Sequence, residues 1–108
     1  DIYIKELNNL DWCKVIKTSP HTNISSKHLF QLLIENNKDE FINYLYGNDI
    51  YPGVHYIDNR QYDPYKIQGK DTCPKSTEYS NKLVTLPIHC SLSNDQLYNI
   101  INQIKQWK

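Results

Sequence analysis

Apolar residues near the C-terminus recur at intervals of three and four positions, which is the spacing of one helix face. Ser93 and Gln96 precede this run three residues apart, as in a capping box, where each side chain accepts a hydrogen bond from the other's backbone N–H. We therefore predict a helix over residues 94–107 with one buried face. That face consists of Leu97, Ile100, Ile101 and Ile104.

An earlier helix is predicted to begin at Asn37. Glu40 stands three residues later, so that the two residues have the spacing of another capping box. Gly47 is the type of residue at which a helix often ends in the left-handed conformation. The start of the chain also has a loose helical spacing, typical of the last turns of a helix that arrives from upstream. Its apolar positions are Ile2, Tyr3, Leu7 and Leu10.

A third internal helix is predicted between Pro74 and about Lys82. Proline suits the first turn of a helix, because its missing N–H would have no helical partner there. Thr72 is placed to cap this helix.

Three short apolar runs predict strands over residues 27–35, 49–57 and 83–88. Pro52 cannot donate to a sheet, so the second strand should lie at an edge or begin after this proline. Alternation of strands and helices predicts an α+β fold, a two-layer sandwich with a small, mostly antiparallel sheet of about three strands packed against helices. We expect one domain over residues 1–108, in which residues 1–23 form a linker and the end of an upstream helix.

The charge balance removes several classes of partner. Twelve Lys and Arg residues match twelve Asp and Glu residues, which gives no electrostatic reason to bind nucleic acid or an anionic membrane. No apolar run approaches the roughly 18–20 residues that span a bilayer. Three widely spaced cysteines do not form a disulfide or metal pattern, so we expect thiols in a reducing compartment and a cytoplasmic protein. Because the chain starts at Asp1 and contains no methionine, we expect a piece of a longer protein.

The four histidines have none of the local spacings of a metal site, so no metal is expected. Nucleotide-binding glycine motifs and nucleophile elbows are also missing from the sequence. The most unusual stretch is "YPGVHYIDNRQYDPY", residues 51–65, which gathers four tyrosines, a histidine and an arginine. Two interpretations of its second half stay open. Residues Asn59, Arg60, Tyr62 and Tyr65 form either a solvated loop or a clamp for sugar hydroxyls or a phosphate.

The order of segments resembles the C-terminal part of the DegT/StrS-type aminotransferases. An S-S-x-H-L strand, a helix that ends before "DI", a G-V-H-Y segment, a C-P helix that leads into L-x-L-P-x-H, and a final L-S-x-D helix follow one another over residues 24–107. Two departures occur, Lys27 in place of an aromatic residue and "IDNRQYDPY" in place of a proline-leucine-histidine loop. The matching residues are Ser25, Ser26, His28, Leu29, Asp39, Phe41, Leu45, Ile50, Gly53, Val54, His55, Tyr56, Cys73, Pro74, Ser80, Leu83, Leu86, Pro87, His89, Leu92, Ser93, Asp95 and Ile100.

The resemblance implies that the parent protein is a homodimeric aminotransferase that uses pyridoxal phosphate. It would convert a nucleotide-linked keto sugar to an amino sugar, with an amino donor such as glutamate. In this family the Schiff-base lysine and most cofactor contacts belong to the large N-terminal domain. The resemblance therefore implies that this chain has no catalytic or cofactor-binding residue, binds no cofactor alone and is inactive alone.

By the same resemblance, this chain would contribute to the substrate-facing wall. The expected substrate contacts are His55, Tyr56, Asn59, Arg60 and Tyr62. For His28 and His89, roles in packing are expected instead. The alternative to the enzyme hypothesis is a stand-alone module that binds a sugar or a protein partner.

Overall fold

The computed structural model describes residues 1–21, 24–68 and 73–107. Its centre is an antiparallel sheet of three strands in the order β1-β2-β3. The strands are β1 (Cys13–Val15), β2 (Phe30–Ile34) and β3 (Leu83–Leu86). Leu32 lies opposite Val15 on one side and Val84 on the other, and all three side chains are buried in one core.

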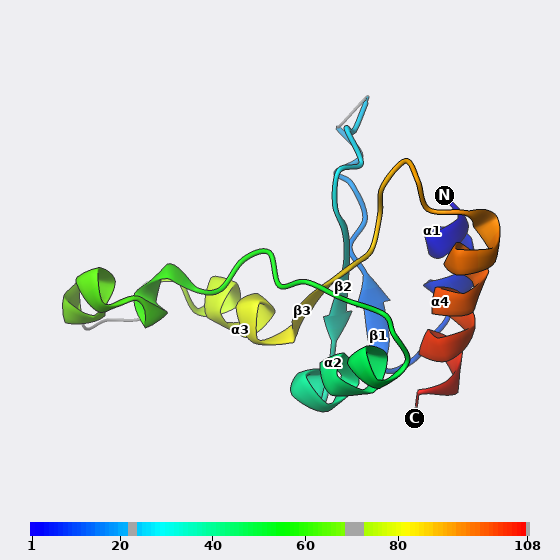
Figure 1. Ribbon diagram of the computed structural model, residues 1–108. Coiled ribbons are helices and arrows are strands. Elements are labelled where there is room, and N and C mark those ends of the chain that lie inside the picture. The colour runs from blue at the N-terminus through cyan, green and yellow to red at the C-terminus, as the bar shows by residue number, and fades with distance from the viewer. Residues whose placement is uncertain (22–23, 69–72, 108) are drawn as a thin grey trace.

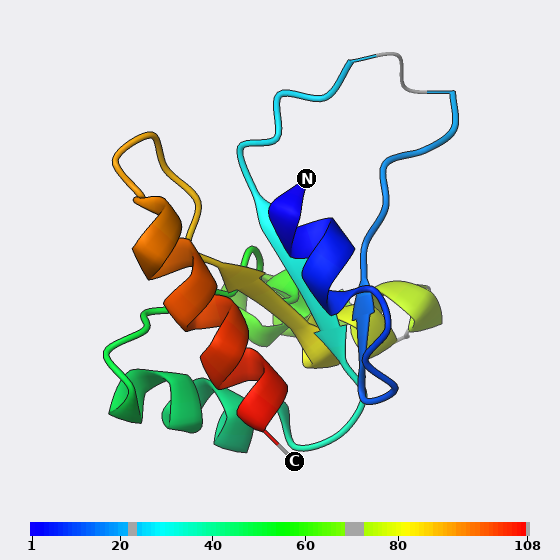
Figure 2. The same cartoon turned by 90° about the vertical axis from the view of Figure 1, so that its right-hand side faces the viewer.

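Four α-helices surround the sheet: α1 (Ile2–Leu7), α2 (Lys38–Gly47), α3 (Pro74–Lys82) and α4 (Asn94–Gln106). Figure 1 shows α1 and α4 on one side of the sheet and α3 on the other. In Figure 2 the helices α1 and α4 lie in front of the strands. This arrangement confirms the predicted α+β class with a three-stranded antiparallel sheet.

The largest fully buried side chain among the described residues is Phe41 of α2. Its ring packs between two tryptophans, with centroid distances of 5.5 Å to Trp12 and 5.7 Å to Trp107. These residues come from the two ends of the chain and from its middle. The core is therefore built from contacts between residues that are far apart in the sequence, which lets a small domain bury enough apolar surface.

Two polar contacts tie the ends of the chain together. The hydroxyl of Tyr3 in α1 donates to the carbonyl oxygen of Pro87 after β3, at 3.0 Å. The Lys105 ammonium of α4 lies 2.6 Å from the Glu6 carboxylate of α1. Both contacts fix α1 to the C-terminal part of the domain, so residues predicted as the end of an upstream helix pack within this core.

The predicted strand over 49–57 was wrong. Only Gly53 pairs there, in a single bridge with Thr85 of β3, with N–O distances of 2.7 and 2.8 Å. Pairing does not extend through Pro52, which has no N–H to donate. The third strand is instead β1, a segment for which no strand was predicted.

The two predicted capping boxes had different outcomes. The box of α4 is confirmed: the Ser93 hydroxyl accepts from the Gln96 N–H at 3.2 Å, and the Gln96 side chain accepts from the Ser93 N–H at 2.9 Å. The box of α2 was wrong. Asn37 takes the cap position with φ 58° and ψ 40°, and its side chain caps no N–H. A capping side chain needs an extended backbone at this position.

The predictions for the ends of the other helices were partly right. Helix α2 ends at Gly47, as predicted, but the left-handed residue is Asp49, with φ 57°. Helix α3 has the predicted bounds, while Cys73 occupies its cap position without a side-chain cap. The predicted cap, Thr72, lies outside the described residues.

The second half of the tyrosine-rich stretch and the residues after it form two short 3₁₀ helices, η1 (Asn59–Gln61) and η2 (Asp63–Gln68). We call residues 57–68 the arm. Figure 1 shows the arm (yellow-green) extending away from the sheet on the side of α3.

In the described part of the chain, no helix is both long and apolar enough to cross a membrane. The three cysteines, all of them described, form no disulfide with one another.

A cavity with a histidine end and an amide end

A cavity of about 620 Å³ lies where the C-terminal end of β3, residues 49–55 and the first half of α4 meet. This volume is within the range of small-molecule sites. Its apolar lining includes Ile50, Leu86 and Ile100, which belong to the core or adjoin it. Residues 49–55 pair with β3 through the single bridge between Gly53 and Thr85, beside the cavity.

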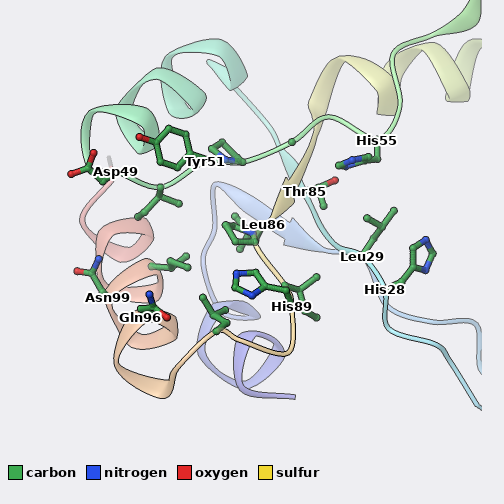
Figure 3. Close-up of a pocket in the computed structure, with 17 residues that line it drawn as sticks. His28, Leu29, Asp49, Tyr51, His55, Thr85, Leu86, His89, Gln96 and Asn99 are labelled. Atoms are coloured by element: carbon green, nitrogen blue, oxygen red, sulfur yellow. The ribbon is translucent and has the colours of Figure 1, made fainter.

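The polar groups of the cavity differ between its two ends, as Figure 3 shows. One end carries imidazoles and a hydroxyl, and the other end carries a carboxylate, a phenol and two amides. The first group is His28, His55 and Thr85, the second group is Asp49, Tyr51, Gln96 and Asn99, and His89 lies between the two groups.

The position of His55 is fixed by its backbone and by Gly53. The Gln31 side-chain amide of β2 donates to the His55 carbonyl oxygen at 2.7 Å. The His55 ring packs over Gly53, where a Cβ atom would lie only 2.6 Å from Cε1 of the ring. A side chain at position 53 would therefore have to displace the imidazole of His55.

Two polar atoms of the cavity wall are buried without a hydrogen-bond partner among the described residues. They are Nδ1 of His55 and Oγ1 of Thr85, whose side chain is only 3% exposed. An unpaired buried polar group costs roughly 1–3 kcal/mol. The histidine end therefore retains hydrogen-bonding capacity that the protein itself does not use.

Of the five predicted substrate contacts, the structure places His55 in the cavity wall. Tyr56, Asn59, Arg60 and Tyr62 are not among the described residues that line the cavity. Tyr56 follows directly and is 72% exposed, and the other three lie on the arm. The substrate roles of all five residues stay predictions.

Arg60 contacts Asp58 and Thr77 of its own domain. Its guanidinium makes a two-pronged ion pair with the Asp58 carboxylate, with Nε 3.0 and 3.1 Å from the two oxygens, and it also donates to the Thr77 hydroxyl of α3. Hydrogen bonds from the side chain and the backbone N–H of Arg60 lower the pKa of Asp58 to about 2.

Sequence reasoning assigned a substrate role to only one residue of the cavity lining, His55. Packing roles were predicted for His28 and His89, which come to line the cavity with His55 although they are separated by up to about sixty residues. Asp49, Thr85 and Asn99 were not singled out, and Gln96 was singled out only for its role in the capping box. Their sequence signal was only that they adjoin the motif residues Ile50, Leu86 and Ile100.

The described residues that line the cavity are histidines, amides, carboxyl and hydroxyl groups beside apolar side chains. No lysine is among the described residues that line it. Within residues 1–21, 24–68 and 73–107, no group of three or more His, Cys, Asp or Glu side chains is placed to hold a metal ion. The polar groups present can bind and orient a ligand through hydrogen bonds.

Comparison with known proteins agrees with this fold. The sequence profile of the DegT/DnrJ/EryC1/StrS aminotransferase family matches residues 1–105. The chain therefore belongs to this family. The search of curated proteins found no match.

Solved structures of similar fold include a putative sugar aminotransferase, Spr1654, from Streptococcus pneumoniae in its apo form. It is 26% identical with a TM-score of 0.85, and the match covers 97% of this chain and 28% of that chain. DesV from S. venezuelae, in complex with a ketimine intermediate, has a TM-score of 0.88 at 23% identity over 97% of this chain and 29% of that chain. PseC from Helicobacter pylori is an aminotransferase involved in the biosynthesis of pseudoaminic acid. It has a TM-score of 0.83 at 20% identity, and the match covers 96% of this chain and 29% of that chain. The chain thus spans less than a third of the length of these structures.

Proposed function

We propose that the protein that carries this chain is a pyridoxal-phosphate-dependent aminotransferase which converts a nucleotide-linked keto sugar to an amino sugar. Glutamate or a similar amino acid would be the amino donor, and the parent would be a cytoplasmic homodimer. The observation that supports this proposal is the family match over residues 1–105, together with the fold shared with sugar aminotransferases.

In this proposal the chain is the C-terminal small domain and contributes a substrate-facing wall. Pyridoxal phosphate, when bound, supplies the amino-transfer chemistry, and the residues that hold it lie outside the cavity described above. The part of this chain is to bind and orient the substrate.

The two ends of the cavity suit different parts of such a substrate. Amide and carboxylate groups from Asp49, Gln96 and Asn99 are suited to sugar hydroxyls, which both donate and accept. The exposed ring of Tyr51 offers a flat apolar face beside them. Imidazoles at the other end can donate to phosphate or carbonyl oxygens.

The first test is the reaction itself in the full-length protein. Purified enzyme with pyridoxal phosphate, glutamate and a panel of nucleotide-linked keto sugars should give 2-oxoglutarate and an amino sugar detectable by mass spectrometry. Turnover of glutamate with other ketones, but with no nucleotide-linked sugar, would contradict the proposed substrate class.

The second test concerns the residues. We expect Arg60→Ala and Tyr62→Phe to raise KM for the sugar nucleotide by about ten- to a hundredfold, as for the loss of one hydrogen bond to a charged group of about 1.5–3 kcal/mol. KM for the amino donor should stay within twofold. Arg60→Lys is the matched control, because it keeps the charge and loses the two-pronged geometry. If both constants stay within twofold in every variant, the arm does not contact substrate.

A further inference from the structure

The histidine end of the cavity contains two polar atoms that the rest of the chain does not pair. Oγ1 of Thr85 and Nδ1 of His55 are both buried, and neither has a hydrogen-bond partner among the described residues. Thr85 is only 3% exposed, and it lines the cavity. Buried polar groups are nearly always paired with protein, water or a ligand. These two atoms therefore indicate hydrogen bonds to a group that is not one of the described residues.

Gly53 brings the two atoms to one place in the cavity wall. Its backbone bonds that of Thr85 in both directions, with N–O distances of 2.7 and 2.8 Å. The His55 ring packs over the same glycine, so that Nδ1 would lie 3.1 Å from a Cβ atom at position 53. Figure 3 shows Thr85 and His55 as neighbours at this end of the cavity. One ligand group beside Gly53 can therefore meet both atoms.

The two side chains can turn toward such a group while their backbone stays in place. The Gln31 amide donates to the His55 carbonyl oxygen at 2.7 Å, and Thr85 belongs to β3, so both backbones are fixed. Among the described residues, neither Nδ1 nor the Thr85 hydroxyl is engaged in a hydrogen bond. A small rotation of each side chain about its Cα–Cβ bond therefore brings the buried atoms to a ligand without breaking any bond that they make.

The chemistry of this pair favours a neutral hydroxyl over an anion. A hydroxyl can donate to one atom of the pair and accept from the other. An ionised phosphate only accepts, and the burial of its charge is costly without a paired cation. No lysine or arginine is among the described residues that line the cavity. His28, by contrast, is exposed, so a phosphate can approach that imidazole and keep most of its water.

We propose that Thr85 and His55 form a subsite for one hydroxyl group of a sugar, in which the Thr85 hydroxyl and Nδ1 of His55 both bind the same ligand oxygen. A ligand with several hydroxyls is favoured because Asp49, Gln96 and Asn99 supply further donors and acceptors in the same cavity of about 620 Å³. The choice of a sugar rests on the proposed function, whereas the choice of a neutral hydroxyl rests on the two buried atoms.

Methyl NMR of the full-length protein tests the proposal without turnover. The δ1 methyl groups of isoleucine are labelled, because Ile50 and Ile100 line the cavity whereas Ile4 of α1 does not and serves as the control signal. The probes are methyl α-D-glucopyranoside, methyl α-D-galactopyranoside and inorganic phosphate. Thr85→Val removes the hydroxyl at nearly equal volume, and His55→Phe keeps a ring without its nitrogens. Thr85→Ser is the matched control, because it keeps the hydroxyl.

We expect at least one glycoside to shift the Ile50 and Ile100 signals while the Ile4 signal stays unchanged. Its dissociation constant should rise by about three- to tenfold in Thr85→Val and in His55→Phe, as for the loss of one neutral hydrogen bond, and should stay within twofold in Thr85→Ser. Phosphate shifts that disappear in Thr85→Val and His55→Phe would show an anion subsite and would overturn the proposal. No shift with either glycoside, or equal affinity in all variants, would also overturn it.

Thermal unfolding of the full-length protein gives a second test that needs no ligand. Thr85→Val should melt at the same temperature as the unchanged protein or higher, because it removes a buried hydroxyl that has no partner. A fall of several degrees would show that the hydroxyl is already bonded within the protein or to a buried water, which contradicts the proposal. Neither measurement requires an amino donor or turnover, so failure of this subsite is distinguishable from failure of the proposed enzymatic activity.

Discussion

Asp58 contacts Arg60 near the start of the arm, and protonation of Asp58 should release that contact. The pKa of Asp58 is lowered to about 2, first by hydrogen bonds from the Arg60 side chain and then by the Arg60 backbone N–H. A carboxyl whose pKa is lowered in the folded state stabilises that state above its ordinary pKa near 4. The stabilisation is lost as pH falls from about 4 through about 2.

The prediction is that the N–H and Nε–H resonances of Arg60 in a ¹H–¹⁵N spectrum shift with a midpoint near pH 2. Asp58→Asn should remove this transition, because the amide cannot form the ion pair. Asp63→Asn is the control, since Asp63 contacts Lys66 and not Arg60. A midpoint near pH 4 in the unchanged chain would contradict the prediction.

At the level of single residues, sequence reasoning identified His55 but not its surroundings. The G-V-H-Y segment marks His55 as unusual without any knowledge of the fold. Thr85 becomes notable only because Gly53 bridges to it and the cavity opens beside it. The sequence also contains no sign that Arg60 is engaged by Thr77, seventeen positions away in another element.

The N-termini of α4 and α2 can be compared directly, because the Ser93 side chain caps α4 whereas the Asn37 side chain does not cap α2. Ser93→Ala should lower the free energy of unfolding by about 1 kcal/mol, since it removes the acceptor for the Gln96 N–H. Asn37→Gly should be neutral or stabilising, because no capping bond is lost and glycine adopts positive φ without strain.

Urea unfolding of the two variants beside the unchanged chain measures both effects. A loss from Asn37→Gly as large as the loss from Ser93→Ala would mean that Asn37 caps α2 in solution.

Sequence patterns were most reliable for the longest element. Helix α4 has thirteen residues, enough for the spacing of its apolar residues to be recognised. Its capping box involves only Ser93 and Gln96, three positions apart in the sequence. Strand β1 has three residues, too few for any alternation, and exists because β2 offers it a partner. The segment around Gly53 has the residue types of a strand, but only tertiary contacts decide that a single bridge forms.

For the molecule as a whole, Phe41 is the residue on which distant parts converge. Phe41→Ala should lower the free energy of unfolding by about 3–5 kcal/mol, because a large side chain is removed from between two tryptophans that cannot fill the space. The total free energy of unfolding of a small domain is only about 5–15 kcal/mol.

Thermal unfolding followed by tryptophan fluorescence measures this loss, since Trp12 and Trp107 both report on the same contact. Tyr98→Ala is the control, because Tyr98 is half-exposed on α4 and should change stability by about 0.5 kcal/mol or less. A Phe41→Ala variant within 1 kcal/mol of the unchanged chain would show that the core relaxes around the deletion.

The pairing of α1 with α4 has a consequence during protein synthesis. The ribosome makes α1 first, but the Glu6–Lys105 ion pair and the aromatic contacts of Trp107 involve residues near the end of this sequence. The apolar faces of α1 and of the sheet must therefore wait until nearly all of this segment has emerged from the exit tunnel. During that interval, Leu7 and Phe41 are available to chaperones that bind nascent chains, and the domain becomes resistant to them only when α4 closes the core.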